Sequence, residues 1–348
     1  MNSPPQLAAL ASLASFFVVV GWLTLKILRS IPGSRQKEGA EIFLVLSGLS
    51  FVVTWFYMSK FIAWSFMDYE ATVALVGTTS EKEFFHTRVA DWLLNTSLFE
   101  QAWKNICFGS AWSWWWNQQL CLYTAGAWTV FLTVEGNRYN IKHLWAYMLL
   151  GQMLTISVGA NLFFYAVARA QRAGTAPPPA RVPLLLAATV PLSMAIVFCT
   201  PWTGDATFGP ALTLMHVLLF APLVVRPAAA ADKHEAAADA GVNAHAFFRL
   251  AMYMTLAMHA HATYTAYTST APDQRALAGL ARAALDALYS HPAQTSVGWD
   301  GICVTLSCAV WAVYSGGYVG RALKRGARFV VGTLVGSVSF AVLDGELE

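Results

Sequence analysis

Residues 112–134 read WSWWWNQQLCLYTAGAWTVFLTV, and they are followed by a polar corner, EGNRYNIKH at 135–143, and a second apolar run, LWAYMLLGQMLTISVGANLFFY at 144–165. The Trp cluster that opens the stretch is typical of a membrane interface. Each apolar run has about 20 residues, which is the length that a helix needs to cross a bilayer. The stretch therefore predicts two membrane helices joined by a polar corner.

One face of the first predicted helix carries groups that hydrocarbon cannot satisfy. Residues at steps of three or four share a helix face. Here they are Asn117, Cys121, Thr124, Trp128, Phe131 and Glu135. Lipid offers these polar groups no partner, so we expect this face to look into the protein.

Composition sets the broad class. Hydrophobic residues make up 57% of the chain, charged residues only 12%, and the mean hydropathy is +0.49. These values predict an all-α, polytopic membrane bundle. The net charge of +3 is too small to favour nucleic-acid binding. The five cysteines form no CxxC pair, so neither a disulfide framework nor a zinc site is expected.

The apolar segments predict a single domain with about eight membrane spans, seven being the alternative. The expected spans are 7–28, 41–67, 112–134, 144–165, 182–200, 208–225, 247–267 and 301–319. An interfacial helix is expected within 71–110, and polar connections at 226–246 and 270–296. The distribution of Lys and Arg over the connections predicts both termini in the cytoplasm, although the basic first connection argues the other way.

With eight spans, the third, fifth and seventh connections lie on one side of the membrane. They would bring together Glu135, Asp205 and Asp300, each beside an aromatic layer. A desolvated carboxyl group holds its proton more tightly and can act as a Brønsted acid. Simpler roles stay open: Asp205 and Asp300 could cap helices, and Glu135 could form an ion pair with Arg138 three residues later.

Metal and nucleotide chemistry is not indicated. His259 and His261 are two residues apart, so they face away from one another on a helix and cannot both bind one metal ion. The sequence has no HExxH motif, no paired Asp motif for magnesium diphosphate and no Gly-rich phosphate loop. We therefore expect neither a metal nor a cofactor.

Several segments resemble a family of fungal polytopic membrane proteins. They are LFEQAW at 98–103, WWWNQQ at 114–119, VEGNR at 134–138, HLWAYMLLGQ at 143–152 and GWD at 298–300. The family includes transmembrane terpene cyclases of meroterpenoid pathways, which close farnesyl-phenol epoxides in ascochlorin, ascofuranone and macrophorin biosynthesis. The resemblance is strongest in the central hairpin.

The resemblance implies a metal-independent cyclase in the endoplasmic reticulum membrane. Its partners would be the bilayer and a lipophilic prenylated aromatic, and its carboxyl group would start a carbocation cyclisation inside aromatic walls. The expected proton donor is Asp205 or Glu135. The groups expected to hold the donor in its acid form, or to take the final proton, are Asp300, Arg138, Asn117 and His143. The expected walls of the substrate pocket are Trp128, Trp202 and Tyr147.

Two other classes of function remain open. The same polar face could form the binding path of a small-molecule or lipid transporter or of a receptor-like bundle. A structural membrane protein could use these polar groups only to hold its helices together.

Overall fold

The computed structural model describes residues 3–31, 39–75, 84–171, 179–224, 241–316 and 319–345. Within these residues the regular structure is helical, apart from two three-residue strands, β1 (Arg181–Pro183) and β2 (Gly241–Asn243), that pair antiparallel. The all-α polytopic bundle predicted from composition is confirmed, and the protein is a multi-pass integral membrane protein.

The helices of the first half follow the predicted spans and the polar region between them. They are α1 (Pro4–Ser30), α2 (Ile42–Leu75), α3 (Phe85–Asn95), α4 (Leu98–Phe108), α5 (Ala111–Leu122), η1 (Tyr123–Trp128), α6 (Thr129–Arg138), α7 (Leu144–Met153) and α8 (Ile156–Ala170). Because η1 continues α5 into α6 with backbone angles in the right-handed helical region, the three form one rod from Ala111 to Arg138.

The helices of the second half include two that the sequence did not fully predict. They are α9 (Leu184–Cys199), η2 (Thr200–Trp202), α10 (Asp205–Val224), α12 (Ala244–Ser269), η3 (Pro272–Gln274), α13 (Leu277–Leu288), α14 (Pro292–Gly316) and α15 (Val319–Gly345). The last span begins earlier than the expected residue 301, and the whole of α15 lies beyond it.

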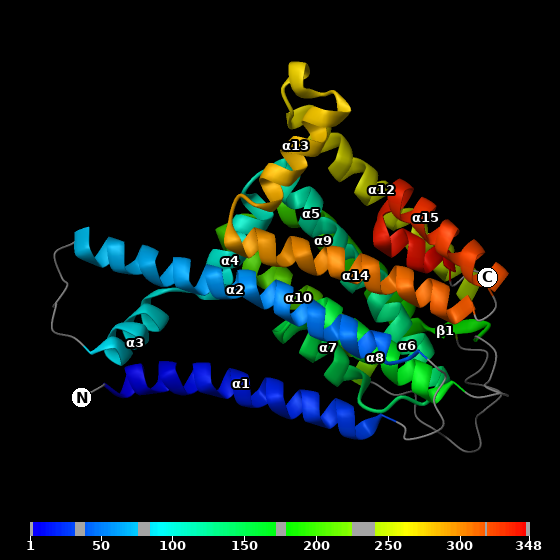
Figure 1. Cartoon of the computed structure of the whole chain (residues 1–348), viewed down its shortest axis with the longest axis horizontal. Helices are drawn as coiled ribbons and strands as arrows, with labels where there is room; N and C mark the ends of the chain where they lie inside the picture. The colour runs from blue at the N-terminus through cyan, green and yellow to red at the C-terminus, as the bar shows by residue number, and fades with distance from the viewer. Residues whose placement is uncertain are drawn as a thin grey trace.

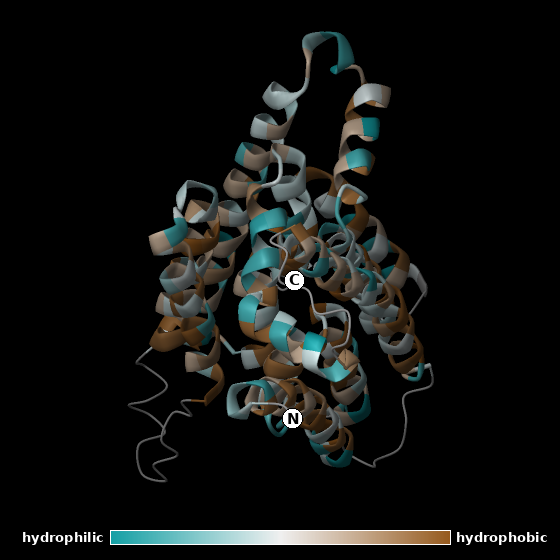
Figure 2. Cartoon of the chain, turned by 90° about the vertical axis from the view of Figure 1, so that its left-hand side faces the viewer, coloured by the Kyte–Doolittle hydropathy of each residue, from teal (hydrophilic) through white to brown (hydrophobic). Residues whose placement is uncertain are grey.

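Among the described residues, six helices are long and apolar enough to cross a membrane. They are α1, α2, α9 continued by η2, α10, α14 and α15. Figure 2 shows hydrophobic ribbon along the helices and hydrophilic ribbon at the turn between α12 and α13. Apolar side chains also remain exposed on the outer faces of these helices, where lipid would cover them, for example Val18 and Val52.

Contacts between helices fix the direction of each one. The rings of Phe43 and Tyr314 lie 5.3 Å apart, so α2 starts beside the end of α14. Phe131 of α6 lies 5.8 Å from Trp311, so the α5–α6 rod runs parallel to α14. The chain crosses the bundle in α1, α2, the α5–α6 rod, α9, α10, α12 and α14 (Figure 1). The described chain consequently begins and ends at opposite ends, which corrects the expectation that both termini share one side.

Charged side chains divide unevenly between the two ends of the bundle. The end at which α1 finishes, called the basic end below, holds Lys26, Arg29, Arg138, Lys142, Arg169, Arg181, Arg249, Arg321, Lys324, Arg325 and Arg328. Its described carboxylates are Glu41, Glu135 and Asp344. The opposite end holds seven carboxylates, Asp68, Glu70, Asp91, Glu100, Asp205, Asp273 and Asp286, and five described cations, Lys60, Arg88, Lys104, Arg275 and Arg282. By the positive-inside rule, this asymmetry favours a cytoplasmic basic end.

The segment expected as a fourth span is a re-entrant hairpin instead. The chain leaves helical geometry at Leu154 (φ −98°, ψ −82°) and Thr155, and α8 then runs back along α7. Both helices are too short to cross a bilayer. Non-helical backbone at membrane depth is tolerated only inside protein, and nearly all of α8 is buried. The hairpin therefore starts and finishes at the basic end.

Close contact between α7 and α8 depends on Gly159. A Cβ atom at this position would lie 2.7 Å from the carbonyl oxygen of Tyr147 and 3.1 Å from the Cα of Gly151. We expect Gly159→Ala to destabilise the detergent-solubilised protein by about 1 to 3 kcal/mol through overpacking, seen as a lower thermal midpoint. Gly48→Ala is the matched control, because no atom lies within 4 Å of a Cβ there. Equal midpoints for the two variants would contradict this packing.

Helix α15 also turns back on itself. Ser337 has φ 82° and ψ 171°, far from helical values. The Arg328 guanidinium donates to the carboxylate of Asp344 at 2.5 and 2.7 Å, although a straight helix would separate the two residues by about 24 Å. The two arms of α15 therefore pack against one another, and their tip is buried beside Leu122, whose carbonyl oxygen accepts from Ser339.

Candidate functional site

The three carboxylates expected to share one site lie apart. Asp205 starts α10 at the end opposite to Glu135, with a side chain that is 91% exposed. Lys104 of α4 lies 3.5 Å from it, in an open groove of about 700 Å³ between α4 and α10. Hydrogen bonding and charge from Glu100 and Asp205 raise the pKa of Lys104. An exposed carboxylate beside an ammonium is a surface ion pair. Asp205 therefore does not share a site with Glu135, and this corrects the expectation that the three carboxylates meet.

Asp300 holds the start of α8. Its two carboxylate oxygens accept from the backbone N–H groups of Ile156 at 2.8 Å and Ser157 at 2.9 Å, and the residue is only 5% exposed. A helix N-terminus presents unsatisfied N–H groups and a positive partial charge, and a carboxylate satisfies both. Asp300 is thus a helix cap, as one of the simpler roles suggested. The helix that it caps is α8, which is distant in sequence, and not its own helix α14.

Glu135 is buried and also lines a cavity. It is 5% exposed, and its oxygens accept from Arg138 Nη1 at 3.1 and 3.2 Å. Glu135 lies at the polar corner, just beyond the apolar run that ends at Val134. The guanidinium of Arg138 is therefore the direct counter-charge of this buried carboxylate.

The cavity beside Glu135 has a volume of about 350 Å³, and six aromatic side chains line it together with apolar and polar residues. We call it the aromatic slot. Its aromatic walls come from the α5–α6 rod, α8, α14, α15 and the start of the α6–α7 turn, and they are Tyr123, Phe131, Tyr139, Phe164, Trp311 and Phe329. The rings of Phe164 and Trp311 stack at 5.0 Å and 11°, so one wall presents a flat face.

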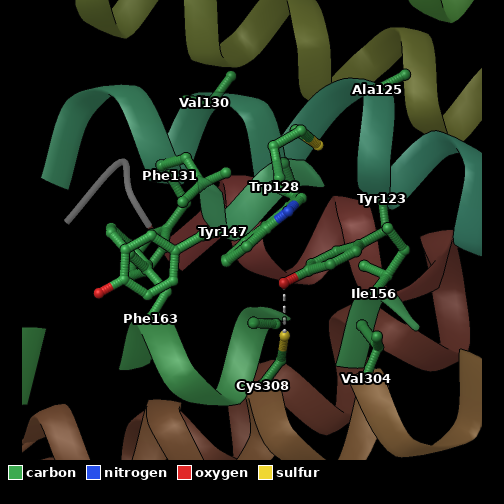
Figure 3. Packing of buried hydrophobic residues seen from close by; sticks show 14 of the residues in the cluster. Tyr123, Ala125, Trp128, Val130, Phe131, Tyr147, Ile156, Phe163, Val304 and Cys308 are labelled. Carbon is green, nitrogen blue, oxygen red and sulfur yellow. Dashed lines mark hydrogen bonds between the residues drawn. The ribbon is translucent and has the colours of Figure 1, made fainter. Parts of the chain in front are cut away.

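The slot reaches from the basic end to the middle of the bundle. Tyr123 and Glu135 both line it, and about 18 Å of helix separates them at 1.5 Å per residue. At the inner end the Cys308 thiol donates to the Tyr123 hydroxyl at 3.5 Å, the contact drawn in Figure 3. Tyr123 belongs to η1, a single π-helical turn, and such turns occur frequently at functional sites.

The mouth of the slot is positively charged. Three arginines line it, Arg138, Arg325 and Arg328. The carboxylates in this region are two, Glu135 and Asp344, so the arginines outnumber them. Arg325 donates to Ser315 Oγ at 3.2 Å, and Arg328 is held by Asp344. An apolar channel with a cationic mouth fits a molecule that joins a lipophilic chain to an acidic or polar head.

Three of the other predicted site residues are structural. Trp128 and Tyr147 are 0% exposed and pack against Phe163 in the core, and neither of them lines the aromatic slot (Figure 3). Asn117 is also 0% exposed, and its Nδ2 donates to the carbonyl oxygen of Ile106 and to Gln294 Oε1. The structure therefore places all three residues outside the aromatic slot.

The two remaining predicted residues line other cavities. Trp202 is 62% exposed and borders a cavity of about 510 Å³ between α5, η2 and α12, at the end opposite to the slot mouth. His143 follows Glu135 and Arg138 in the same corner, yet it faces a separate cavity beside α1. The polar corner thus serves two sites.

Sequence reasoning missed Trp311, Phe164, Arg325 and Arg328 at the slot. The spacing of Trp311 and Tyr314 on one face of the last expected span was an available signal for the walls. Arg325 and Arg328 belong to α15, which follows the last expected span and whose apolar run is interrupted by glycines and serines.

Comparison with known proteins adds one partial match. Residues 71–169 match the sequence model of DUF2834, described as a protein of unknown function, and this region extends from the end of α2 through almost all of α8. No curated protein and no solved structure matches the chain. The matched region covers Glu135, Arg138 and the re-entrant hairpin but not α14 or α15, which complete the aromatic slot.

Proposed function

We propose that the protein is a membrane-bound, metal-independent cyclase that acts on a prenylated aromatic, a farnesyl-phenol epoxide, in the aromatic slot. One observation carries the proposal: a buried carboxyl group, Glu135, lies at the polar mouth of a long cavity walled by aromatic rings. The resemblance to fungal transmembrane terpene cyclases supports the same chemistry.

The slot suits the two parts of such a substrate. A prenyl chain is apolar and would exclude water from the aromatic walls. A phenolic or carboxylate head would remain at the mouth, where Arg138, Arg325 and Arg328 supply hydrogen-bond donors. A chain folded back within the slot would place its epoxide beside Glu135, and folding also brings the alkenes into contact with the epoxide carbon.

The ion pair with Arg138 has a role in this scheme. With no substrate bound, Arg138 favours the ionised form of Glu135. A substrate head that engages Arg138 would weaken this pair and leave the buried carboxyl group to bind a proton. In this scheme Glu135 is the proton donor and Arg138 is a positioning residue.

The reaction is an isomerisation. Glu135 donates its proton to the epoxide oxygen, the carbon–oxygen bond breaks, and the electron pair of an alkene forms a new carbon–carbon bond. The resulting tertiary cation loses a proton to the Glu135 carboxylate, so the carboxyl group is regenerated and the mass is unchanged. The faces of Trp311 and Phe164 would stabilise the cation through cation–π attraction.

The proposed location is the endoplasmic reticulum membrane, with the basic end in the cytoplasm. In this orientation the mouth of the slot opens towards the cytoplasmic leaflet, where a lipophilic substrate dissolved in the bilayer could reach it. The distribution of basic side chains supports the orientation.

A second candidate function is binding without chemistry, as in a transporter or a receptor-like bundle. The observation that favours it is the cationic mouth itself, because an arginine-paired carboxylate is suited to hold an amphipathic anion in place. Uptake of a labelled amphiphile into proteoliposomes, with no change in the molecule, would support this candidate.

The cyclase proposal is tested in microsomes that contain the full chain. Incubation with a farnesyl-phenol epoxide should give a product of unchanged mass with a new ring, identified by liquid chromatography with mass spectrometry and by NMR. Microsomes from the same host without the protein are the control. The incubation is repeated with several farnesyl-phenol epoxides that differ in the phenolic head. If all of them are recovered unchanged although the protein is present and folded, the proposal is contradicted.

A further inference from the structure

Helix α1 is loosely attached to the rest of the bundle. Only Leu23 and Ile27 are buried along its length, and it contacts α3 and α7 and, through the ring of Trp55, α2. At the basic end the rings of Trp22 and Trp145 lie 6.1 Å apart, and Lys26 Nζ lies 5.6 Å from the Trp145 ring, so both side chains of α1 contact α7. A helix held by so few contacts needs a further source of cohesion, or it must tolerate movement.

A cavity of about 380 Å³ separates the last turns of α1 from the turn that joins α6 to α7. We call it the basic cup. Its charged and polar lining comes from Lys26, Arg29 and Ser30 of α1 and from Lys142 and His143 of the turn. His143 has left-handed backbone angles (φ 59°, ψ 45°), which non-glycine residues adopt rarely, and the turn is therefore fixed in an unusual conformation.

The cations of the basic cup lack counter-charges. Among the residues that the structure describes, no ion pair involves Lys26, Arg29 or Lys142. Lys26 Nζ lies 4.8 Å from the ring of Trp22 and 5.6 Å from that of Trp145, so the aromatic rings are its described partners. Three cations without an ion pair among the described residues surround one concave space, and such a cluster attracts anions.

We propose that the basic cup binds the phosphate head of an anionic phospholipid, which bridges α1 to the α6–α7 turn. The ligand is a lipid and not free phosphate because the cup opens on a lipid-facing surface: Trp22 is 50% exposed and Leu25 is 52% exposed. The acyl chains would lie along these residues while the phosphate meets Lys26, Arg29 and Lys142. This site lies outside the aromatic slot and does not depend on the cyclase proposal.

The experiment measures lipid binding to the full chain, purified in detergent and stripped of lipid. Phosphatidylserine is titrated while the thermal midpoint is followed, beside phosphatidylcholine and inorganic phosphate at equal concentrations. Phosphatidylserine should raise the midpoint and the other two should not. The triple variant Lys26→Gln/Arg29→Gln/Lys142→Gln should bind phosphatidylserine about a hundredfold more weakly.

A control variant removes the same number of charges elsewhere. Lys60, Arg249 and Arg282 are exposed and outside the basic cup, and their joint replacement by Gln should leave the affinity unchanged. If the triple cup variant does not fold, Lys142→Gln alone should weaken binding about fivefold. Equal affinity in the cup and control variants would overturn the proposal, and so would an equal effect of inorganic phosphate.

Discussion

Replacing Glu135 by Gln is expected to lower cyclised product formation by at least a hundredfold, with the protein present in normal amount. Glutamine has nearly the same size but cannot donate a proton, and positioned proton donors contribute about 10² to 10⁴ in rate. The measurement is the initial rate of product formation in microsomes, divided by the amount of folded protein. Glu135→Asp, which keeps the acid but withdraws it by one methylene, should retain a fraction of the activity.

The matched control for Glu135 is Asp205→Asn. Asp205 was an equal candidate for the proton donor on sequence grounds, but it is exposed at the other end of the bundle and paired with Lys104. Its replacement should therefore leave the rate within about twofold of the original. Loss of activity in Asp205→Asn with full activity in Glu135→Gln would reject the aromatic slot as the site. Thermal midpoints of both variants separate a catalytic defect from an unfolded protein.

Replacing Asp300 by Ala is expected to cause the largest loss of stability. It removes an acceptor from two buried backbone N–H groups at the start of α8, and hydrogen bonds to a charged group contribute about 1.5 to 3 kcal/mol each. The expected loss is therefore about 3 kcal/mol or more. It is read as a fall in the thermal midpoint in detergent. Asp300→Asn keeps one carbonyl acceptor, so its thermal midpoint should lie between those of the original protein and of Asp300→Ala.

The control for Asp300 is an exposed carboxylate on a neighbouring element. Asp286 of α13 is exposed, and Asp286→Ala should leave the midpoint close to that of the original protein. A midpoint in Asp300→Ala that matches Asp286→Ala would show that the start of α8 does not depend on the carboxylate. Loosening of the start of α8 can also be measured locally, as the rate at which a cysteine reagent labels a Leu154→Cys variant. Adding Asp300→Ala should raise this rate.

The sequence was sufficient for the helical class and for most membrane helices, because long apolar runs can satisfy their backbone groups in lipid only as helices. The α7–α8 hairpin could not be predicted this way. Its break at Leu154 and Thr155 contains neither Gly nor Pro, and the run that it interrupts has the length of a span. Because residues 144–165 were expected to cross the membrane and do not, every later connection was assigned to the wrong side. Asp205 was for this reason expected beside Glu135.

The roles of the carboxylates depended on partners distant in sequence. Asp300 meets backbone groups of residues 156 and 157, which no local pattern indicates. The aromatic slot needs Phe329 and the arginines of α15, a helix hidden by its charges and by its turn at Ser337. The pair of Glu135 and Arg138, in contrast, is local to one helix, and the sequence was sufficient to suggest it.

The reversal of α15 determines how the protein should be handled in the laboratory. Because the second arm returns to the basic end, Gly345 lies on the rim of the aromatic slot. A purification tag or fluorescent fusion joined directly after Gly345 would start at that opening and obstruct it. Fusions placed before α1 start at the far side of the bundle and leave the opening free.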